Sequence, residues 1–290
     1  MEKHIFKFGE SSVAMIVPKK WADKNGLKAS GTVHVSENEL GNLIISAKGS
    51  SKMEAEKVVS SRTKPTFIGR WVGLHYQYGV AKLRLYSADG LTHAQTEEVE
   101  RKINGECPGY EITSQSNKDV IIEDFTNMKE VDIGKIVKRL RSLVNQEFRE
   151  MLEGDPKTIA KIERLVNRFY MLGMRYVNIT QAKDDLKYFG ILRSLETISD
   201  RLDMLSEIKE ARKKAIFEQL GRQFDESFKG LEGDSKAIES LAEGREAVHA
   251  QIIRARLDKL STYLLKDISN NISAIAEYGL KSEGEEKPFL

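Results

Sequence analysis

Apolar residues change their spacing along the chain, from alternation near the N-terminus to a three-and-four repeat over the second half. His4 to Phe8 alternates, Val13 to Val17 is continuously apolar, and Gly31 to Val35 with Asn42 to Ser46 reads as a strand pair. From Val131 almost to the end, apolar residues recur every three or four positions. Alternation is typical of strands, and the longer repeat is typical of helices. The chain is therefore predicted to be mostly α with an N-terminal β domain.

The stretch from Gly154 to Asp203 predicts two packed helices. Asp155 before Pro156 has the pattern of a helix N-cap followed by proline at the first helical position, where the missing N–H costs nothing. Apolar residues then follow helical spacing on both sides of a polar break.

Beside each of these two stripes lies a polar pair spaced by four residues. Glu163 is paired in this way with Asn167, and Glu196 with Asp200. Residues four apart share one face of a helix, so each pair can present its oxygens to one point.

A short segment of the helical half recurs later in the chain. Leu152 to Ile159 returns as Leu231 to Ile238, with Asp234 in the place of the capping Asp155. Such an echo indicates a duplicated helical unit, although chance similarity of a common cap signal is the alternative. Together with six predicted helices joined by short loops, the echo predicts two tandem three-helix bundles.

Between the β domain and the bundles, the signals are mixed. Residues 48–65 are polar and read as a linker, and Phe67 to Phe125 combines helices and strands as a small α/β connector. Gly26 and Gly79 each follow a predicted helix as its C-terminal stop. The predicted domains are a dimerising β domain (1–47), a linker with a small α/β module (48–127), tandem bundles (128–280) and a disordered tail (281–290).

Composition narrows the functional classes. The formal net charge of +2 is nearly neutral, the single cysteine fits a reducing compartment, and five scattered histidines lack metal-ligand spacing. We find no run of 18 apolar residues, no signal peptide and no nucleophile or phosphate-loop motif in the sequence. These observations predict a cytoplasmic protein that is neither an enzyme nor inserted in a membrane.

The first 47 residues carry a recognisable order of motifs. They are Gly9, Ser11-Ser12, Ile16-Val17-Pro18, Lys19-Lys20-Trp21 with Lys24, Gly26-Leu27 and Ser30-Gly31. This order resembles the AbrB/SpoVT-like domain, a swapped-hairpin fold that implies an intertwined homodimer with basic side chains offered to DNA. Residues 1–28 contain six lysines and three acidic residues, which gives this segment a net positive charge. The DNA-binding candidates are Lys3, Lys7, Lys19, Lys20 and Lys24.

That family commonly uses arginine on this surface, and this chain has none there. Because arginine reads guanine with two hydrogen bonds whereas lysine acts as a point charge, base-specific recognition is open. The alternative is a solvated lysine face on a domain that only dimerises.

From about residue 128 to 280, the chain resembles the phosphate-uptake regulator (PhoU) family, above all its archaeal branch with an N-terminal AbrB-like domain. The residues that carry the resemblance are Ile162 to Tyr170, Tyr188-Phe189, Leu195 to Asp200, Leu265 to Asn270 and Ile275 to Glu277. The resemblance implies PhoU-like tandem three-helix bundles whose acidic pairs converge on a metal cluster.

For this chain, the resemblance places the metal candidates in the first bundle, at Glu163, Asn167, Glu196 and Asp200. Their hard oxygen donors suit iron, zinc or nickel, although Asn167 stands where the family has an acid. In the second bundle, Lys266 and Asn270 replace the acids, so no metal is expected there. Otherwise the acids of the first bundle form a solvated flank or pair with arginines.

The two resemblances imply a phosphate-responsive transcriptional regulator that binds DNA as a homodimer and relays phosphate status through its bundles. The alternative is a PhoU-type signalling adaptor. Its bundles would contact a phosphate transporter ATPase or a sensor kinase, and its N-terminal domain would only dimerise.

Overall fold

The computed structural model describes residues 4–28, 31–37, 43–46, 53–180, 186–208 and 214–280 of the chain. These residues belong to two compact units, Met1–Lys52 and Met53–Leu290. The chain is mostly helical, with a small β region at its N-terminus, as the apolar spacing predicts. Lys3 and the C-terminal segment predicted to be disordered lie outside the described residues.

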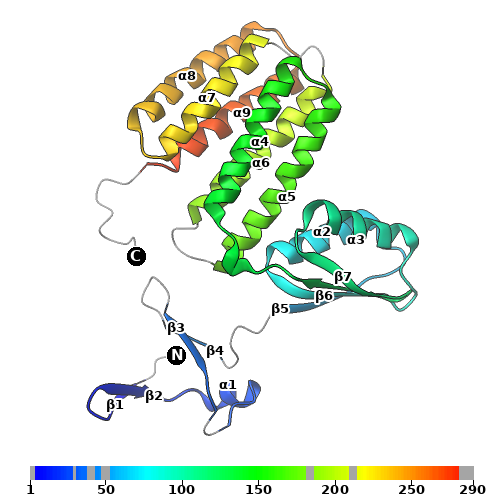
Figure 1. Cartoon of the computed structure of the whole chain (residues 1–290), viewed down its shortest axis with the longest axis vertical. Helices are drawn as coiled ribbons and strands as arrows, with labels where there is room; N and C mark the ends of the chain where they lie inside the picture. Colours follow the sequence, from blue (N-terminus) through cyan, green and yellow to red (C-terminus); the bar gives the residue numbers. More distant parts are fainter. Residues whose placement is uncertain are drawn as a thin grey trace. The chain divides into compact units, whose positions relative to one another are not determined.

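The first unit consists of two antiparallel hairpins and a short helix (Figure 1). The elements are β1 (Ile5–Phe8), β2 (Ser12–Met15), α1 (Lys19–Lys24), β3 (His34–Glu37) and β4 (Leu43–Ser46). Gly26 follows α1 with a φ of 66°, the left-handed conformation that its predicted role as a helix stop requires. The predicted strands and helix are confirmed. None of the residues of this unit whose burial is described is buried.

The second unit begins with a four-stranded sheet and two helices. The elements are β5 (Met53–Val58), α2 (Pro65–Gln77), β6 (Val80–Tyr86), α3 (His93–Glu106), β7 (Tyr110–Gln115) and β8 (Asp119–Asp124). The strand order is β5-β6-β8-β7, with β5 parallel to β6 and the other pairs antiparallel. Helices α2 and α3 cover one face of this sheet (Figure 1). Gly79 ends α2 with a φ of 79°, as predicted.

The prediction that residues 48–65 form only a linker is wrong, because β5 lies within them. Glu54 and Glu56 give this strand a linker-like composition, but they share the solvent face of the sheet with Lys82 and Arg84 of β6. The Arg84 guanidinium contacts the Glu56 carboxylate at 2.9 Å. The strand is recognised only through its partner, which is distant in sequence.

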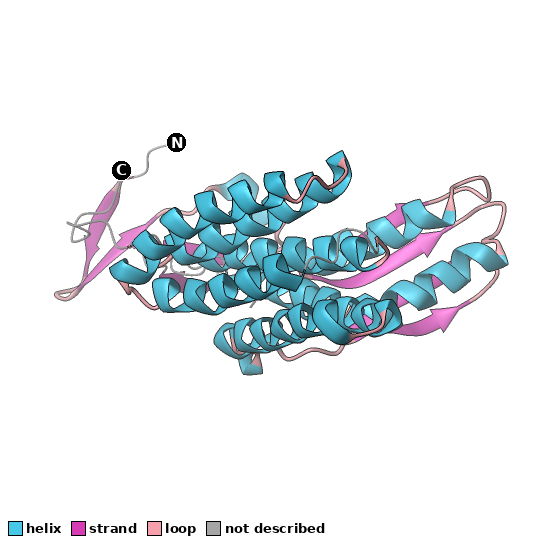
Figure 2. Ribbon diagram, turned by 90° about the horizontal axis from the view of Figure 1, so that it is seen from above, coloured by secondary structure: helices cyan, strands magenta, loops and turns pink. Residues whose placement is uncertain are grey.

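Six helices make up the rest of the second unit, and in Figure 2 they run side by side. They are α4 (Ile133–Glu153), α5 (Pro156–Thr180), α6 (Leu186–Ser206), α7 (Lys214–Leu231), α8 (Ser235–Arg254) and α9 (Lys259–Glu277). Helices α4, α5 and α6 pack on one another, as do α7, α8 and α9, and the two triplets meet through α4 with α7 and α6 with α9. Within the described residues, no helix is long and apolar enough to cross a membrane.

The repeated segments begin the second helix of each triplet. Asp155 accepts a hydrogen bond from the backbone N–H of Lys157 at the start of α5, at 3.2 Å. Asp234 accepts from the N–H groups of Lys236 and Ala237 at the start of α8, at 3.0 and 3.2 Å. Each aspartate satisfies donors that the first turn of a helix leaves unpaired.

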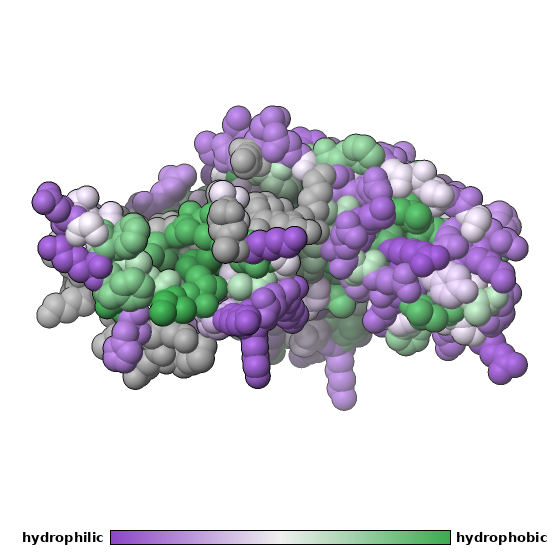
Figure 3. Space-filling model, turned by 90° about the horizontal axis from the view of Figure 1, so that it is seen from below, coloured by the Kyte–Doolittle hydropathy of each residue, from purple (hydrophilic) through white to green (hydrophobic). Residues whose placement is uncertain are grey.

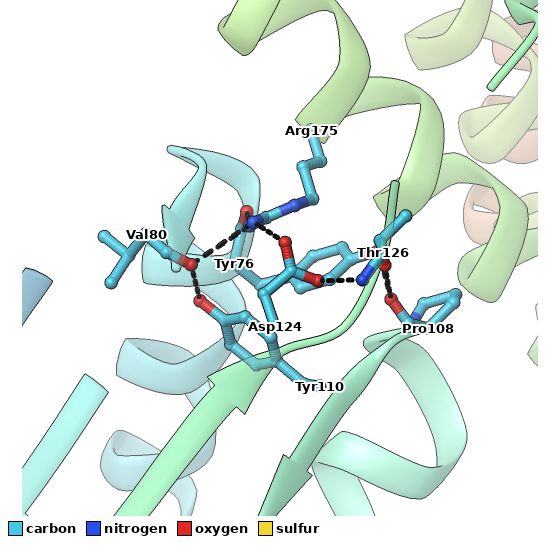
Figure 4. Close-up of polar contacts among 7 residues, drawn as sticks. All are labelled: Tyr76, Val80, Pro108, Tyr110, Asp124, Thr126 and Arg175. Atoms are coloured by element: carbon cyan, nitrogen blue, oxygen red, sulfur yellow. Dashed lines mark hydrogen bonds and ion pairs between the residues drawn. The ribbon is translucent and has the colours of Figure 1, made fainter. Parts of the chain in front are cut away.

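Arg175 of α5 joins the helices to the sheet layer (Figure 4). Its side chain is 1% exposed and forms an ion pair with the buried carboxylate of Asp124, at the end of β8. The guanidinium also donates to the carbonyls of Tyr76 and Val80, and it lies over the rings of Tyr76 and Tyr110 at 4.8 and 5.4 Å. The α/β module and the helices predicted as separate domains therefore belong to one unit.

We predict that Arg175→Met destabilises the second unit strongly. The substitution leaves the Asp124 carboxylate buried without its cation, which typically costs about 3–5 kcal/mol of unfolding free energy. Urea denaturation at pH 7 measures the loss, and Lys161→Met, at an exposed position of the same helix, is the control. Adding Asp124→Asn to Arg175→Met should recover part of the loss. Equal stability of Arg175→Met and Lys161→Met would contradict the prediction.

Candidate functional site

Four of the five candidate DNA-binding lysines lie in the described part of the first unit. Lys7 is on β1, and Lys19, Lys20 and Lys24 are on α1. All four are exposed, and none forms an ion pair among the described residues. Lys20 and Lys24 are four residues apart and share one face of α1. These cations remain available to an external anion.

Beside the lysines, the first hairpin exposes apolar side chains on both of its faces. The register pairs Lys7 with Val13 and Phe8 with Ser12, so Val13 and Phe8 point to opposite sides of the hairpin. Val13 is 68% exposed and Phe8 is 69% exposed. In Figure 3, apolar residues in green gather where this hairpin lies. An isolated two-stranded hairpin with both faces in water is at best marginally stable.

A cleft of about 730 Å³ continues this apolar surface within the first unit. Met15, Trp21 and Leu43 are among its apolar lining residues, and Lys19 and Lys20 stand at the same cleft. The lysines and the apolar surface are therefore adjacent.

In the second unit, the candidate acids on α5 and α6 are close enough to influence one another. Asn167 donates a side-chain hydrogen bond to Glu163, so this predicted pair forms within α5. Burial, together with the negative charges of Asp200 and Asp203, raises the pKa of Glu163 to about 7. Glu163 is thus a carboxyl group that exchanges its proton near neutral pH.

The α6 pair is also partly buried rather than a solvated flank. Burial and the neighbouring Asp200 raise the pKa of Glu196, while Arg193, at 3.3 Å from the Glu196 carboxylate, opposes the shift. Burial likewise raises the pKa of Asp200. Arg193 pairs with Glu196 within α6 and not across the helices as the alternative predicted, and Arg168 donates to the Asn104 carbonyl at 3.2 Å.

Glu147 of α4 belongs to this acidic cluster, and sequence reasoning missed it. The residue is fully buried, its Oε1 accepts from the Ser199 hydroxyl at 2.6 Å, and its Oε2 has no partner among the described residues. Burial raises its pKa well above the ordinary value, and nearby acids including Glu163 add to the shift. The sequence does carry a signal for its burial, because Glu147 falls on the apolar stripe of α4 between Val144 and Met151.

The cluster does not have the geometry of a metal centre. Among the described residues, no group of three or more histidine, cysteine, aspartate or glutamate side chains converges as metal ligands would. Glu163 is hydrogen-bonded to Asn167, and Glu196 is paired with Arg193. The carboxyl groups of this arrangement can take up and release protons.

In the second triplet, Lys266 and Arg245 lie near His249. Burial lowers the pKa of His249, and the nearby Lys266 and Arg245 lower it further. The lysine that replaces an acid in the sequence therefore lies in a cationic environment, which disfavours a metal cation.

Comparison of the chain with protein-family models, with curated proteins and with solved structures finds no match.

We predict that Glu163→Gln reduces the loss of stability at alkaline pH. A carboxyl group with a raised pKa in the folded state stabilises the fold fully below its unfolded pKa, and this contribution disappears as pH rises through about 7. After allowance for the partial exposure of Glu163, the change between pH 5 and pH 8 is about 1 kcal/mol. Urea denaturation of the wild type and the variant at both pH values measures it.

An exposed carboxylate, Glu232, provides the matched control as Glu232→Gln. A wild type and a Glu163→Gln variant that lose equal stability between pH 5 and pH 8 would contradict the assignment.

Proposed function

We propose that this protein is a homodimeric DNA-binding regulator that responds to phosphate status. The first unit binds DNA, and the helical part of the second unit relays the signal. The observation that carries the proposal is the group of four exposed, unpaired lysines beside an apolar surface that a single chain leaves in water.

Dimerisation follows from the apolar surface. Apolar side chains are exposed on both faces of the first hairpin. A layer of protein packed on one face alone would leave the apolar side chains of the other face in water. A second copy that exchanges hairpins covers both faces and makes one shared core. Dimerisation also doubles the lysine count, because each copy contributes Lys7, Lys19, Lys20 and Lys24.

DNA is the partner that fits this surface. Lysine ammonium groups neutralise phosphates without regard to base identity, and two linked sets of them bind more tightly than one. The absence of arginine from the described part of this unit favours backbone contacts over base readout. Specificity then depends on the spacing between the two sets and on the shape of the duplex.

The two helical triplets support a relay rather than catalysis. Their core runs without interruption from the sheet layer through both triplets, and Arg175 fixes the first triplet to the sheet. A change at the surface of one triplet can therefore reach the other through packed side chains.

We predict that DNA binding depends steeply on salt and on α1. Lys19→Glu/Lys20→Glu should abolish the shift of duplex DNA in a gel assay, because it places repulsive charges against phosphates. Lys19→Gln/Lys20→Gln should lower the slope of log affinity against log salt by roughly three to four for a dimer that loses four phosphate contacts. Lys157→Glu/Lys161→Glu, on exposed positions of α5, is the control. Absence of binding by the wild type at low salt would leave the adaptor alternative.

We also predict that a charge in the first hairpin separates the copies. Phe8→Asp should convert a dimer into a monomer, measured by light scattering coupled to gel filtration, because a carboxylate buried there between the copies lies opposite Ser12 rather than a cation. Ser11→Asp adds the same charge to the exposed turn of this hairpin and should remain dimeric. A wild type that is monomeric at micromolar concentration would contradict the dimer.

A further inference from the structure

The two helical triplets meet in a groove that no part of the proposed DNA-binding surface uses. The groove lies between α4 and α7, the first helix of each triplet, and has a volume of about 770 Å³. Phe148 and Phe217 line it and are themselves 4% and 1% exposed. The groove thus has aromatic residues at its base and is open to solvent above them.

Its walls carry more positive than negative charge. Lys138, Arg141 and Arg149 stand on α4, and Arg222 faces them from α7. Lys138, Arg149 and Arg222 are exposed, and none has an ion-pair partner among the described residues. Three cations are therefore available to a ligand.

The two carboxylates at the groove do not neutralise these cations. Asp225 accepts a hydrogen bond from the side-chain amide of Asn145 at 3.0 Å and lies 3.6 Å from Arg141. Glu218 lies 3.9 Å from Lys214, which does not line the groove. Each carboxylate already has a partner, and the remaining charge of the groove is positive.

The polar residues of α4 that line the groove lie on one face of the helix. Lys138, Arg141, Asn145 and Arg149 follow one another at intervals of three and four residues, so their side chains share one face of the helix. Arg222 supplies a guanidinium from the opposite wall. Guanidinium groups bind phosphate oxygens in pairs, whereas a single carboxylate would satisfy only one of these groups.

We propose that this groove binds an organic phosphate of nucleotide size. The phosphates lie between Arg149 and Arg222, and the apolar or aromatic body of the ligand lies over Phe148 and Phe217. The volume is within the range of small-molecule sites, and inorganic phosphate alone would leave most of it unfilled. The role of this ligand as the effector of DNA binding rests on the proposed function, whereas binding itself does not.

Gly221 of α7 provides a way to fill the groove without changing its charge. A Cβ atom at this position would lie 3.8 Å from the Phe148 side chain, which is ordinary van der Waals contact. Gly221 lines the groove, so a leucine there would occupy the space above the aromatic residues. Replacement of glycine inside a helix also favours the helical conformation, so the variant should fold.

The test is isothermal titration of the full-length protein with AMP, ADP and ATP, and with adenosine and inorganic phosphate as separate arms. We expect ADP or ATP to bind with a Kd below about 1 mM, and more tightly than inorganic phosphate or adenosine. Arg222→Glu should weaken nucleotide binding by roughly 10- to 100-fold through the loss of charge-assisted hydrogen bonds. Gly221→Leu should weaken it with all charges retained.

Two controls separate the groove from general effects of charge and folding. Lys161→Glu changes the same charge at an exposed position of α5 and should leave nucleotide affinity unchanged. Circular dichroism verifies that each variant keeps its helical content. The proposal is overturned if none of the three nucleotides binds, if inorganic phosphate binds as tightly as they do, or if Gly221→Leu and Arg222→Glu bind nucleotide like the wild type.

A gel-shift titration with and without ADP then separates the site from its role. If nucleotide binds the groove and changes the DNA affinity of the wild type but not of Gly221→Leu, the effector role is supported. If nucleotide binds the groove and DNA affinity stays constant, the binding site is supported and the effector role is overturned. If DNA does not bind at all, titration with nucleotide still decides the groove proposal.

Discussion

The ion pair between Arg175 and Asp124 makes the sheet layer and the helices one folded unit. Burying the charged guanidinium of an arginine that is 1% exposed destabilises the fold without a compensating anion, and Asp124 supplies it from the end of β8. The carbonyls of Tyr76 and Val80 accept further hydrogen bonds from its two terminal nitrogens, and two tyrosine rings flank it, while its Nε has no partner among the described residues. Helix α5 is consequently held against the sheet at a fixed position, and α4 and α6 pack around it.

A second set of buried polar groups lies inside the first triplet. Unlike the Arg175–Asp124 ion pair, it consists of groups with the same charge. Glu147, Glu163 and Asp200 are acids that burial and mutual repulsion make reluctant to ionise. Such groups lower the stability of the fold as pH rises, so their presence is a cost that apolar residues at the same positions would avoid. The arrangement provides a proton-sensitive element within an otherwise apolar bundle.

The two units differ in how much of its apolar surface a single chain buries. The second unit encloses a continuous core from Val59 to Ala276, whereas Phe8 and Val13 of the first unit remain largely in water. This contrast is the physical basis for the proposed dimer. It also places the proposed DNA contacts and the nucleotide groove on different units, so that each can be altered without the other.

Local periodicity determined the helices, their caps and the hairpins, because a stripe of apolar residues, an Asp before the first turn and a Gly after the last one act within a few positions. It also paired Glu163 with Asn167 and Glu196 with Asp200, whereas only the family resemblance implied that the two pairs converge; in the structure Asp200 raises the pKa of both Glu163 and Glu196. Only the tertiary structure decided that residues 53–58 pair as a strand, that Arg175 is buried on Asp124, and that Glu147 lies inside the bundle. The partners in these cases are between 27 and 52 residues away, and no pattern along the chain encodes which distant group will neutralise a buried charge.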